Sequence, residues 1–132
     1  MIRDEIEKLA LTEINLDSPD SGSQQFCPGA AFIGFHGHFP GYPILPAMLQ
    51  VLFGVLVTEK ILAAKLILKK LDKAKFMTQI KPEETLTVSC KIIQPSAKNP
   101  AKAMSTAEIK TQVTILVKEQ KAASMTLLLI PE

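Results

Sequence analysis

The sequence has few of the features that mark specialised classes of protein. Its 2 cysteines are too few for a disulfide framework and the wrong number for a structural zinc site. Its 15 Lys and Arg residues against 13 Asp and Glu residues give a net charge of +2, which does not point to nucleic acid or a membrane surface as a partner. The longest apolar run, residues 47–57, is far shorter than the roughly 20 residues of a membrane-spanning helix, so we expect no membrane span.

What is present is typical of one globular domain. Hydrophobic residues make up 47% of the chain and charged residues 21%, which excludes a disordered or low-complexity protein. A length of 132 residues suits one core, so we expect a single domain over residues 1–132. The first ten residues carry acids where a signal peptide would be apolar, and two cysteines suit a reducing compartment. We therefore expect a cytoplasmic protein.

The apolar periodicity predicts two helices, a short amphipathic one over residues 2–10 and a long one from Ala47 to about residue 64. The long helix follows Pro46 and is apolar almost all round in its first three turns, so we expect it to be buried. Gln50, Gly54 and Thr58 fall on one line at i, i+4 and i+8. That stripe predicts the close approach of another backbone.

Alternating apolar residues predict the strands, while residues 16–22, LDSPDSG, are typical of a turn. The predicted strands are residues 24–27, 66–80, 84–94, 107–118 and 122–130. One buried helix followed by four long strands in succession predicts an α+β fold, with an antiparallel meander curled around the helix.

Residues 30–46, AAFIGFHGHFPGYPILP, separate the first strand from the long helix. This segment holds three prolines and three glycines, so it cannot form a regular helix, and it is too apolar for a disordered linker. The sequence therefore specifies a fixed irregular loop, the kind of segment in which functional sites tend to lie.

Residues 37–49, GHFPGYPILPAML, closely resemble the signature GHFPxxPxxPG of the hotdog-fold β-hydroxyacyl-acyl carrier protein dehydratases. A second patch resembles that family's KFxxxVxPGDxL segment at the expected spacing, through Lys75-Phe76, Pro82 and Leu86. The resemblance implies a hotdog fold, in which an antiparallel sheet wraps one long central helix. It also implies a dimer or an oligomer of dimers with active sites at the subunit interface.

The resemblance also implies roles for particular residues. Dehydration of a 3-hydroxyacyl thioester needs a base at C2 and an acid for the departing hydroxyl. His38 would carry the proton transfers at C2, and the backbone N–H of Ala47 would polarise the thioester carbonyl. The substrate channel would be lined by Phe35, Phe39, Pro46, Leu52 and Leu56. No cofactor is implied.

The sequence departs from the family pattern at the helix. The family's acid, fourteen residues after the histidine, falls on Leu52, whose side chain cannot transfer a proton. The family's Gln falls on Leu56, and Ala47 replaces the last Gly of the motif. Three residues come into question as replacements for the acid, and the sequence selects none of them. Glu59 lies roughly 10 Å further along the helix, too far to substitute without rearrangement. Gln50 points about 200° away around the helix and is neutral, so it could orient a water but is not a normal proton donor. His36 shares a side with His38 in an extended segment, and a protonated imidazole can act as an acid.

The same residues leave several functions open. The leading prediction is a dehydratase that acts on 3-hydroxyacyl-acyl carrier protein thioesters. The alternatives are a non-catalytic protein that binds acyl chains or carrier protein, and a subunit of a hetero-oligomeric dehydratase whose second hotdog subunit supplies the acid. A third alternative, thioester hydrolysis on the same fold, would also need a carboxylate near the thioester. A metal site at His36 and His38 would need further ligands that are not clustered with them, so no metal is expected.

Seven lysines lie between residues 60 and 81, in a span that contains one acid, Asp72. A basic face there would suit docking of an acidic acyl carrier protein. The same lysines are equally typical of a solvated strand edge, where they discourage pairing with another sheet.

Overall fold

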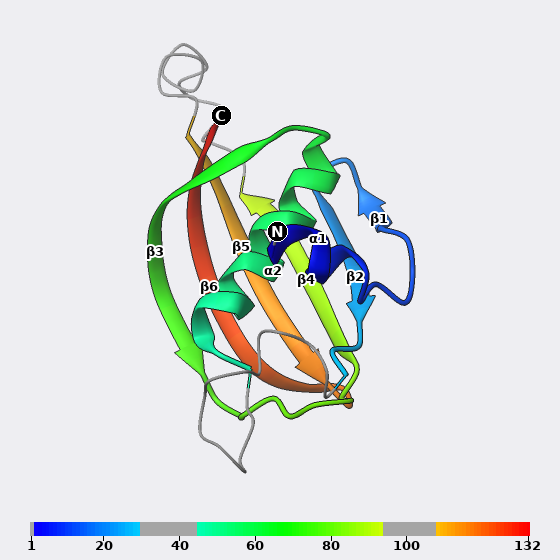
Figure 1. Ribbon diagram of the computed structural model, residues 1–132. Coiled ribbons are helices and arrows are strands. Elements are labelled where there is room, and N and C mark those ends of the chain that lie inside the picture. Colours follow the sequence, from blue (N-terminus) through cyan, green and yellow to red (C-terminus); the bar gives the residue numbers. More distant parts are fainter. Residues whose placement is uncertain (1, 30–44, 94–107) are drawn as a thin grey trace.

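The computed structural model describes residues 2–29, 45–93 and 108–132. These residues form two helices and six strands, and the strands make one layer that curves around the longer helix (Figure 1). The elements are α1 (Ile2–Glu7), β1 (Asn15–Ser18), β2 (Ser21–Phe26), α2 (Ala47–Leu62), β3 (Leu66–Phe76), β4 (Leu86–Ile93), β5 (Ile109–Val117) and β6 (Gln120–Pro131). The strands form a single antiparallel sheet in the order β1-β2-β4-β5-β6-β3. The predicted α+β architecture, a sheet curved around one long helix, is confirmed.

The first hairpin shows where the turn prediction was wrong. Residues 16–22 were predicted to be a turn, but most of them belong to β1 and to the start of β2, and only residues 19 and 20 separate the two strands. Pro19 and Asp20 do form the tip of the hairpin, so the turn chemistry was assigned over too long a segment. The flanking Ser and Gly residues are paired across strands. Ser18 pairs with Ser21 in the hairpin, and Gly22 pairs with Cys90 of β4.

The position of β3 also differs from the predicted meander. Of the four long strands that follow α2, β4, β5 and β6 are neighbours in chain order, whereas β3 pairs with β6 at the far edge of the sheet. β4 already has β2 on one side and β5 on the other, so no edge of it is free for the strand that precedes it in the chain. β3 also ends at Phe76, earlier than the predicted strand over residues 66–80.

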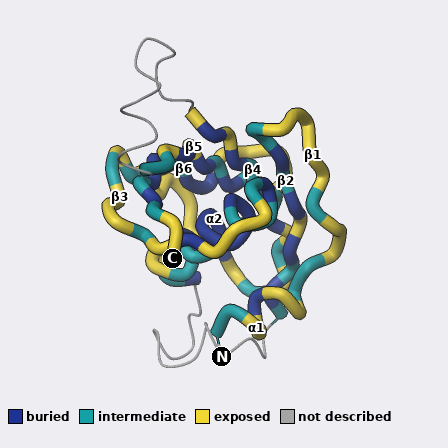
Figure 2. Tube along the Cα trace, turned by 90° about the horizontal axis from the view of Figure 1, so that it is seen from above, coloured by how far each residue is buried: buried dark blue, intermediate teal, exposed yellow. Residues whose placement is uncertain are grey.

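The long helix α2 lies inside the curve of the sheet (Figure 2). Pro46 precedes it in an extended conformation, and Ala63 ends it with a left-handed φ of 52° and a hydrogen bond from its N–H to the oxygen of Glu59. Phe53 of α2 is fully buried and meets Phe26 of β2 edge to face, with ring centroids 4.9 Å apart. The core therefore forms between α2 and the concave face of the sheet.

The stripe of Gln50, Gly54 and Thr58 does mark a close approach, but to side chains rather than to another backbone. A Cβ built on Gly54 would lie 2.8 Å from Cγ2 of Val113 on β5. Gly54 is therefore needed because β5 packs against the helix where a larger residue would collide. The Thr58 hydroxyl donates a hydrogen bond of 2.8 Å to the Gly54 carbonyl, which satisfies a polar group in the core.

One side of α2 is less buried than the sequence predicts. Met48 is 66% exposed and Leu52 is half-buried, whereas the later turns are covered. The sheet covers the other sides of the helix, so the apolar residues of its first two turns leave an open strip facing β3. Neither helix of the described ranges is long and apolar enough to cross a membrane.

Candidate active site

The start of α2 is the feature that matches the predicted site most directly. Pro46 makes no side-chain capping hydrogen bond, and the first turn holds no acidic residue. The carbonyl of Pro46 accepts from the N–H groups of Leu49 and Gln50, at 3.1 and 3.2 Å. The first N–H groups of a helix lack intrahelical acceptors, and those of Ala47 and Met48 make no hydrogen bond to an acceptor in the part of the chain that the structure describes. The helix dipole adds positive potential at the same point, which suits an oxygen that gains negative charge.

Leu45 and Gln50 fix the backbone that leads into this helix start. The Leu45 N–H donates to the carbonyl of Ile80 at 2.8 Å, and the Leu45 carbonyl accepts from Nε2 of Gln50 at 3.1 Å. Gln50 is 3% exposed, and its Oε1 is the one buried side-chain N or O atom in the described ranges that lacks a hydrogen-bond partner. Gln50 is thus a support of the helix start. It carries no acidic proton, so it does not replace the missing acid.

Leu52 lies in an apolar groove between α2 and β3. The groove has a volume of about 400 Å³, and its polar lining comes from Arg3 and Glu132. Its apolar lining residues are Met48, Leu49, Val51, Leu52, Val55, Leu66, Ile67 and Leu68. The expected channel residue Leu52 therefore belongs to the open strip of α2, close to the first turn of the helix.

The other expected channel residues of the described ranges do not line the groove. Leu56 is buried and borders a second hollow of about 460 Å³, which it shares with charged residues of α1 and of the end of α2. Pro46 precedes the helix and lines neither of these two hollows. Leu52 and Leu56 thus border different hollows in the described residues, and the single channel expected for both remains a prediction.

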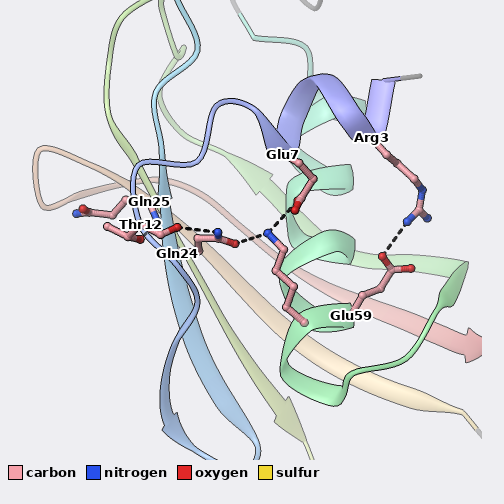
Figure 3. Close-up of polar contacts among 7 residues, drawn as sticks. Arg3, Glu7, Thr12, Gln24, Gln25 and Glu59 are labelled. Carbon is pink, nitrogen blue, oxygen red and sulfur yellow. Dashed lines mark hydrogen bonds and ion pairs between the residues drawn. The ribbon is translucent and has the colours of Figure 1, made fainter.

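Glu59 does not replace the missing acid in this arrangement. Its side chain is 12% exposed, and its contact with Arg3 is drawn in Figure 3. Oε1 accepts from Nη1 of Arg3 at 2.7 Å, and Oε2 accepts from the N–H of Leu66 at 2.8 Å. Both carboxylate oxygens of Glu59 are therefore already engaged as hydrogen-bond acceptors within the fold. The contact between Glu59 and Arg3 is not predictable from the local sequence, because 56 residues separate the two side chains.

The basic span of residues 60–81 is only partly free for an acidic partner. Lys60 is bound to Glu7 at 2.8 Å and to Oε1 of Gln24 at 2.6 Å, and Lys69 forms an ion pair with Glu108. The remaining lysines of the span, Lys65, Lys70, Lys73, Lys75 and Lys81, are exposed. The span is therefore a mixed surface in which some lysines have structural partners.

The two cysteines differ in their surroundings, although both are free thiols. Burial raises the pKa of the Cys90 thiol from 9.0 to about 12, so this cysteine is a core residue, not a nucleophile. Cys27 is only half-buried.

Four of the predicted site residues, Phe35, His36, His38 and Phe39, lie outside the described residues. The roles expected for them remain predictions. Within residues 2–29, 45–93 and 108–132, no three His, Cys, Asp or Glu side chains are grouped so that they could hold a metal ion.

Comparisons with known proteins agree with the motif. The model of the ApeI-like family, described as ApeI dehydratase, matches residues 19–118. The 3-hydroxyacyl-[acyl-carrier-protein] dehydratase FabZ of Fusobacterium nucleatum is 35% identical over 63 residues, which cover 44% of this chain and 45% of that protein. FabZ of Petrotoga mobilis is 33% identical over 86 residues, 60% of each chain. The chain thus spans about half the length of these curated relatives.

Solved structures show the fold. A chain of the dehydratase heterocomplex ApeI:P from Xenorhabdus doucetiae superposes with a TM-score of 0.69 at 16% identity, covering 92% of this chain and 96% of that one. The HP0420 homologue from Helicobacter felis gives 0.67 at 12% identity, covering 94% and 89%. The hotdog fold and the dehydratase-family resemblance predicted from the motif are confirmed. With 100 consecutive residues, 19–118, matched by the family model, the chain belongs to the ApeI-like dehydratase family.

Proposed function

We propose that this protein acts on 3-hydroxyacyl thioesters carried by an acyl carrier protein, and that its reaction is dehydration. A base removes the proton at C2, the C3–O bond breaks, and the hydroxyl leaves with a proton as water while the C2–C3 double bond forms. His38 is the proposed base at C2. The Ala47 N–H is the proposed donor to the thioester oxygen, which gains negative charge as the C2 proton leaves.

The observation that carries this proposal is the uncapped start of α2 beside an apolar groove. A thioester oxygen at the Ala47 N–H would have its acyl chain next to Met48, Leu49 and Leu52, which line the near part of that groove. The site thus offers a polar contact for the reacting group and an apolar surface for the rest of the acyl chain. Family membership and the names of the FabZ relatives support the same substrate class.

The acid that protonates the departing hydroxyl is the part of the site for which this chain offers no described residue. Leu52 cannot supply a proton, and both oxygens of Glu59 accept hydrogen bonds. The second candidate function is therefore a subunit of a hetero-oligomeric dehydratase in which another hotdog chain supplies the acid. The likeness to the ApeI:P heterocomplex favours this candidate over a non-catalytic acyl-binding protein.

The exposed edge of β3 is the surface that we propose for association with a second chain. Among the described strands β3 is the last of the sheet and pairs with β6 alone, so its outer edge presents backbone donors and acceptors that no described strand takes up. Ile67 and Leu71 on this strand are large exposed apolar residues. We propose a dimer through this edge, either of two identical chains or with a second hotdog subunit, in the cytoplasm.

A dehydration assay with 3-hydroxyacyl-acyl carrier protein tests these candidates. If the homodimer is the enzyme, the purified protein alone forms the 2-enoyl product, and His38→Ala abolishes the reaction. If a second subunit supplies the acid, the protein alone is inactive, and Leu52→Glu creates activity that depends on His38. Inactive Leu52→Glu protein, together with no activity when a second hotdog protein is added, would contradict both catalytic candidates.

A further inference from the structure

Arg3 lies between the two hollows of the molecule. It belongs to α1 and lines both the apolar groove beside Leu52 and the charged hollow beside Leu56. Its guanidinium is held by the Glu59 carboxylate at 2.7 Å (Figure 3), and Glu59 is fixed in turn by the Leu66 N–H at 2.8 Å. Arg3 and Glu59 therefore form a fixed ion pair between the apolar groove and the charged hollow.

The lining of the groove is apolar except for two charged residues. Along α2 it extends from Met48 to Val55, which corresponds to roughly 10 Å of helix. Met48 lies beside the uncapped helix start, whereas Arg3 and Glu132 supply the charged residues of the lining. Beyond Arg3, the second hollow is lined by charged residues that include Asp4, Glu7 and Lys60. An acyl chain that starts at Ala47 thus has an apolar path of limited length.

We propose that the Arg3–Glu59 ion pair is the end of the acyl-binding groove and sets the longest acyl chain that the protein accepts. This inference rests on the proposed function, because it takes the acyl thioester as the occupant of the groove. Each methylene buried against apolar side chains raises affinity by about fourfold. A methylene that reaches the ion pair gains no such contact and must displace or desolvate two charged groups. Affinity therefore rises with chain length and then stops rising.

The chain offers a matched control for this role. Arg3 and Lys60 both link α1 to α2, through the Arg3–Glu59 and Lys60–Glu7 ion pairs. Only Arg3 lines the apolar groove, since Lys60 borders the charged hollow alone. If the ion pairs served only to hold α1 in place, Arg3→Ala and Lys60→Ala would have the same effect on acyl binding.

The experiment measures binding of non-hydrolysable amide analogues of acyl-pantetheine, in which nitrogen replaces the thioester sulfur, to this chain, with butanoyl, hexanoyl, octanoyl, decanoyl and dodecanoyl groups. For the wild-type protein we expect affinity to rise by about fourfold per methylene and then to level off. Arg3→Ala should move this plateau to longer chains and raise affinity for the longest probes at least tenfold. Arg3→Lys and Lys60→Ala should leave the plateau in place.

Three results would overturn the inference: a wild-type protein without chain-length-dependent binding, a plateau that Arg3→Ala does not move, and an equal shift in Lys60→Ala. The first result is expected if a second protein chain, not an acyl group, covers the groove. Because the readout is binding, it is independent of turnover. An inactive protein whose plateau moves in Arg3→Ala contradicts the proposed catalysis alone, and an active protein whose plateau does not move contradicts this inference alone.

Discussion

The Nε2 of Gln50 donates a hydrogen bond to the carbonyl oxygen of Leu45 at 3.1 Å, across the residue that begins the central helix. Leu45 is held at its other end by the carbonyl of Ile80. The peptide that precedes Pro46 is thus fixed from both sides, and with it the direction of the first N–H groups of α2. This explains why a buried glutamine is present in a helix that is otherwise apolar at its start.

We expect Gln50→Glu to make stability depend on pH. The carboxyl can donate to the Leu45 carbonyl only when it is protonated, and burial raises its pKa above the unfolded value of about 4.3. A raised folded-state pKa means that stability is present below the unfolded pKa and is lost as the pH rises through the folded pKa. At pH 7 the variant should be about 1–3 kcal/mol less stable than wild type, and most of this loss should disappear near pH 4.

Chemical denaturation at several pH values measures this effect, with Gln50→Met as the control. Methionine has a similar size and also loses the hydrogen bond to Leu45, but it introduces no titrating group. The free energy of unfolding of Gln50→Met should therefore be lower than that of wild type but should depend on pH in the same way. A Gln50→Glu variant as stable as wild type at pH 7 would show that the contact with Leu45 does not constrain the helix start.

Gly54→Ala should destabilise the fold by about 1–3 kcal/mol, because the added methyl meets Cγ2 of Val113 at 2.8 Å and overpacks the core. Gly29→Ala is the matched control, since a Cβ there meets no atom within 4 Å. Thermal unfolding of both variants measures the difference. Adding Val113→Ala to Gly54→Ala should cost less than the sum of the two single changes. Strict additivity would contradict the contact between α2 and β5.

Cys90 should make the protein less stable at alkaline pH. Its thiol ionises at about 12 in the folded protein against 9.0 for an unperturbed thiol, because burial disfavours the thiolate. The folded-state pKa is raised, so this contribution is complete below pH 9 and is lost as the pH rises from 9 towards 12, by up to about 1.4 kcal/mol per pH unit. Cys90→Ala removes the titrating group, and the difference between its pH–stability curve and that of wild type isolates the effect. Parallel curves from pH 8 to 11 would contradict the shift.

The sequence predicts the elements of this fold better than their arrangement. α2 and the strands β4, β5 and β6 are recognisable because their apolar residues repeat with the period of a helix or of a strand. β1 is hidden by turn-forming residues that are also paired with β2. The place of β3 beside β6 depends on which edge of the sheet remains free, and a local pattern does not contain that information.

The candidate site is likewise predictable from the sequence only in part. A fixed motif at residues 37–49 identifies the helix start and the missing acid at Leu52, because the family places those groups at constant spacing. The motif does not reveal the ion pair that joins Arg3 to Glu59, since 56 residues separate the two side chains. The charge of Arg3 among the acidic residues of the first helix is the one sequence signal, and it does not identify the partner.

The free edge of β3 gives the last prediction, which concerns assembly. If a second chain pairs with this edge, Leu71→Lys or Ile67→Lys places a charge among the exposed apolar residues of the interface and should shift the protein towards monomer by at least tenfold in dissociation constant. Leu16→Lys on β1 is the matched control, because Leu16 is an equally exposed apolar residue on the opposite edge of the same sheet. Sedimentation velocity over a range of concentrations measures the dissociation constant. Dissociation caused by Leu16→Lys, with no change in the β3 variants, would place the interface on the other edge and leave the groove beside Leu52 away from the partner chain.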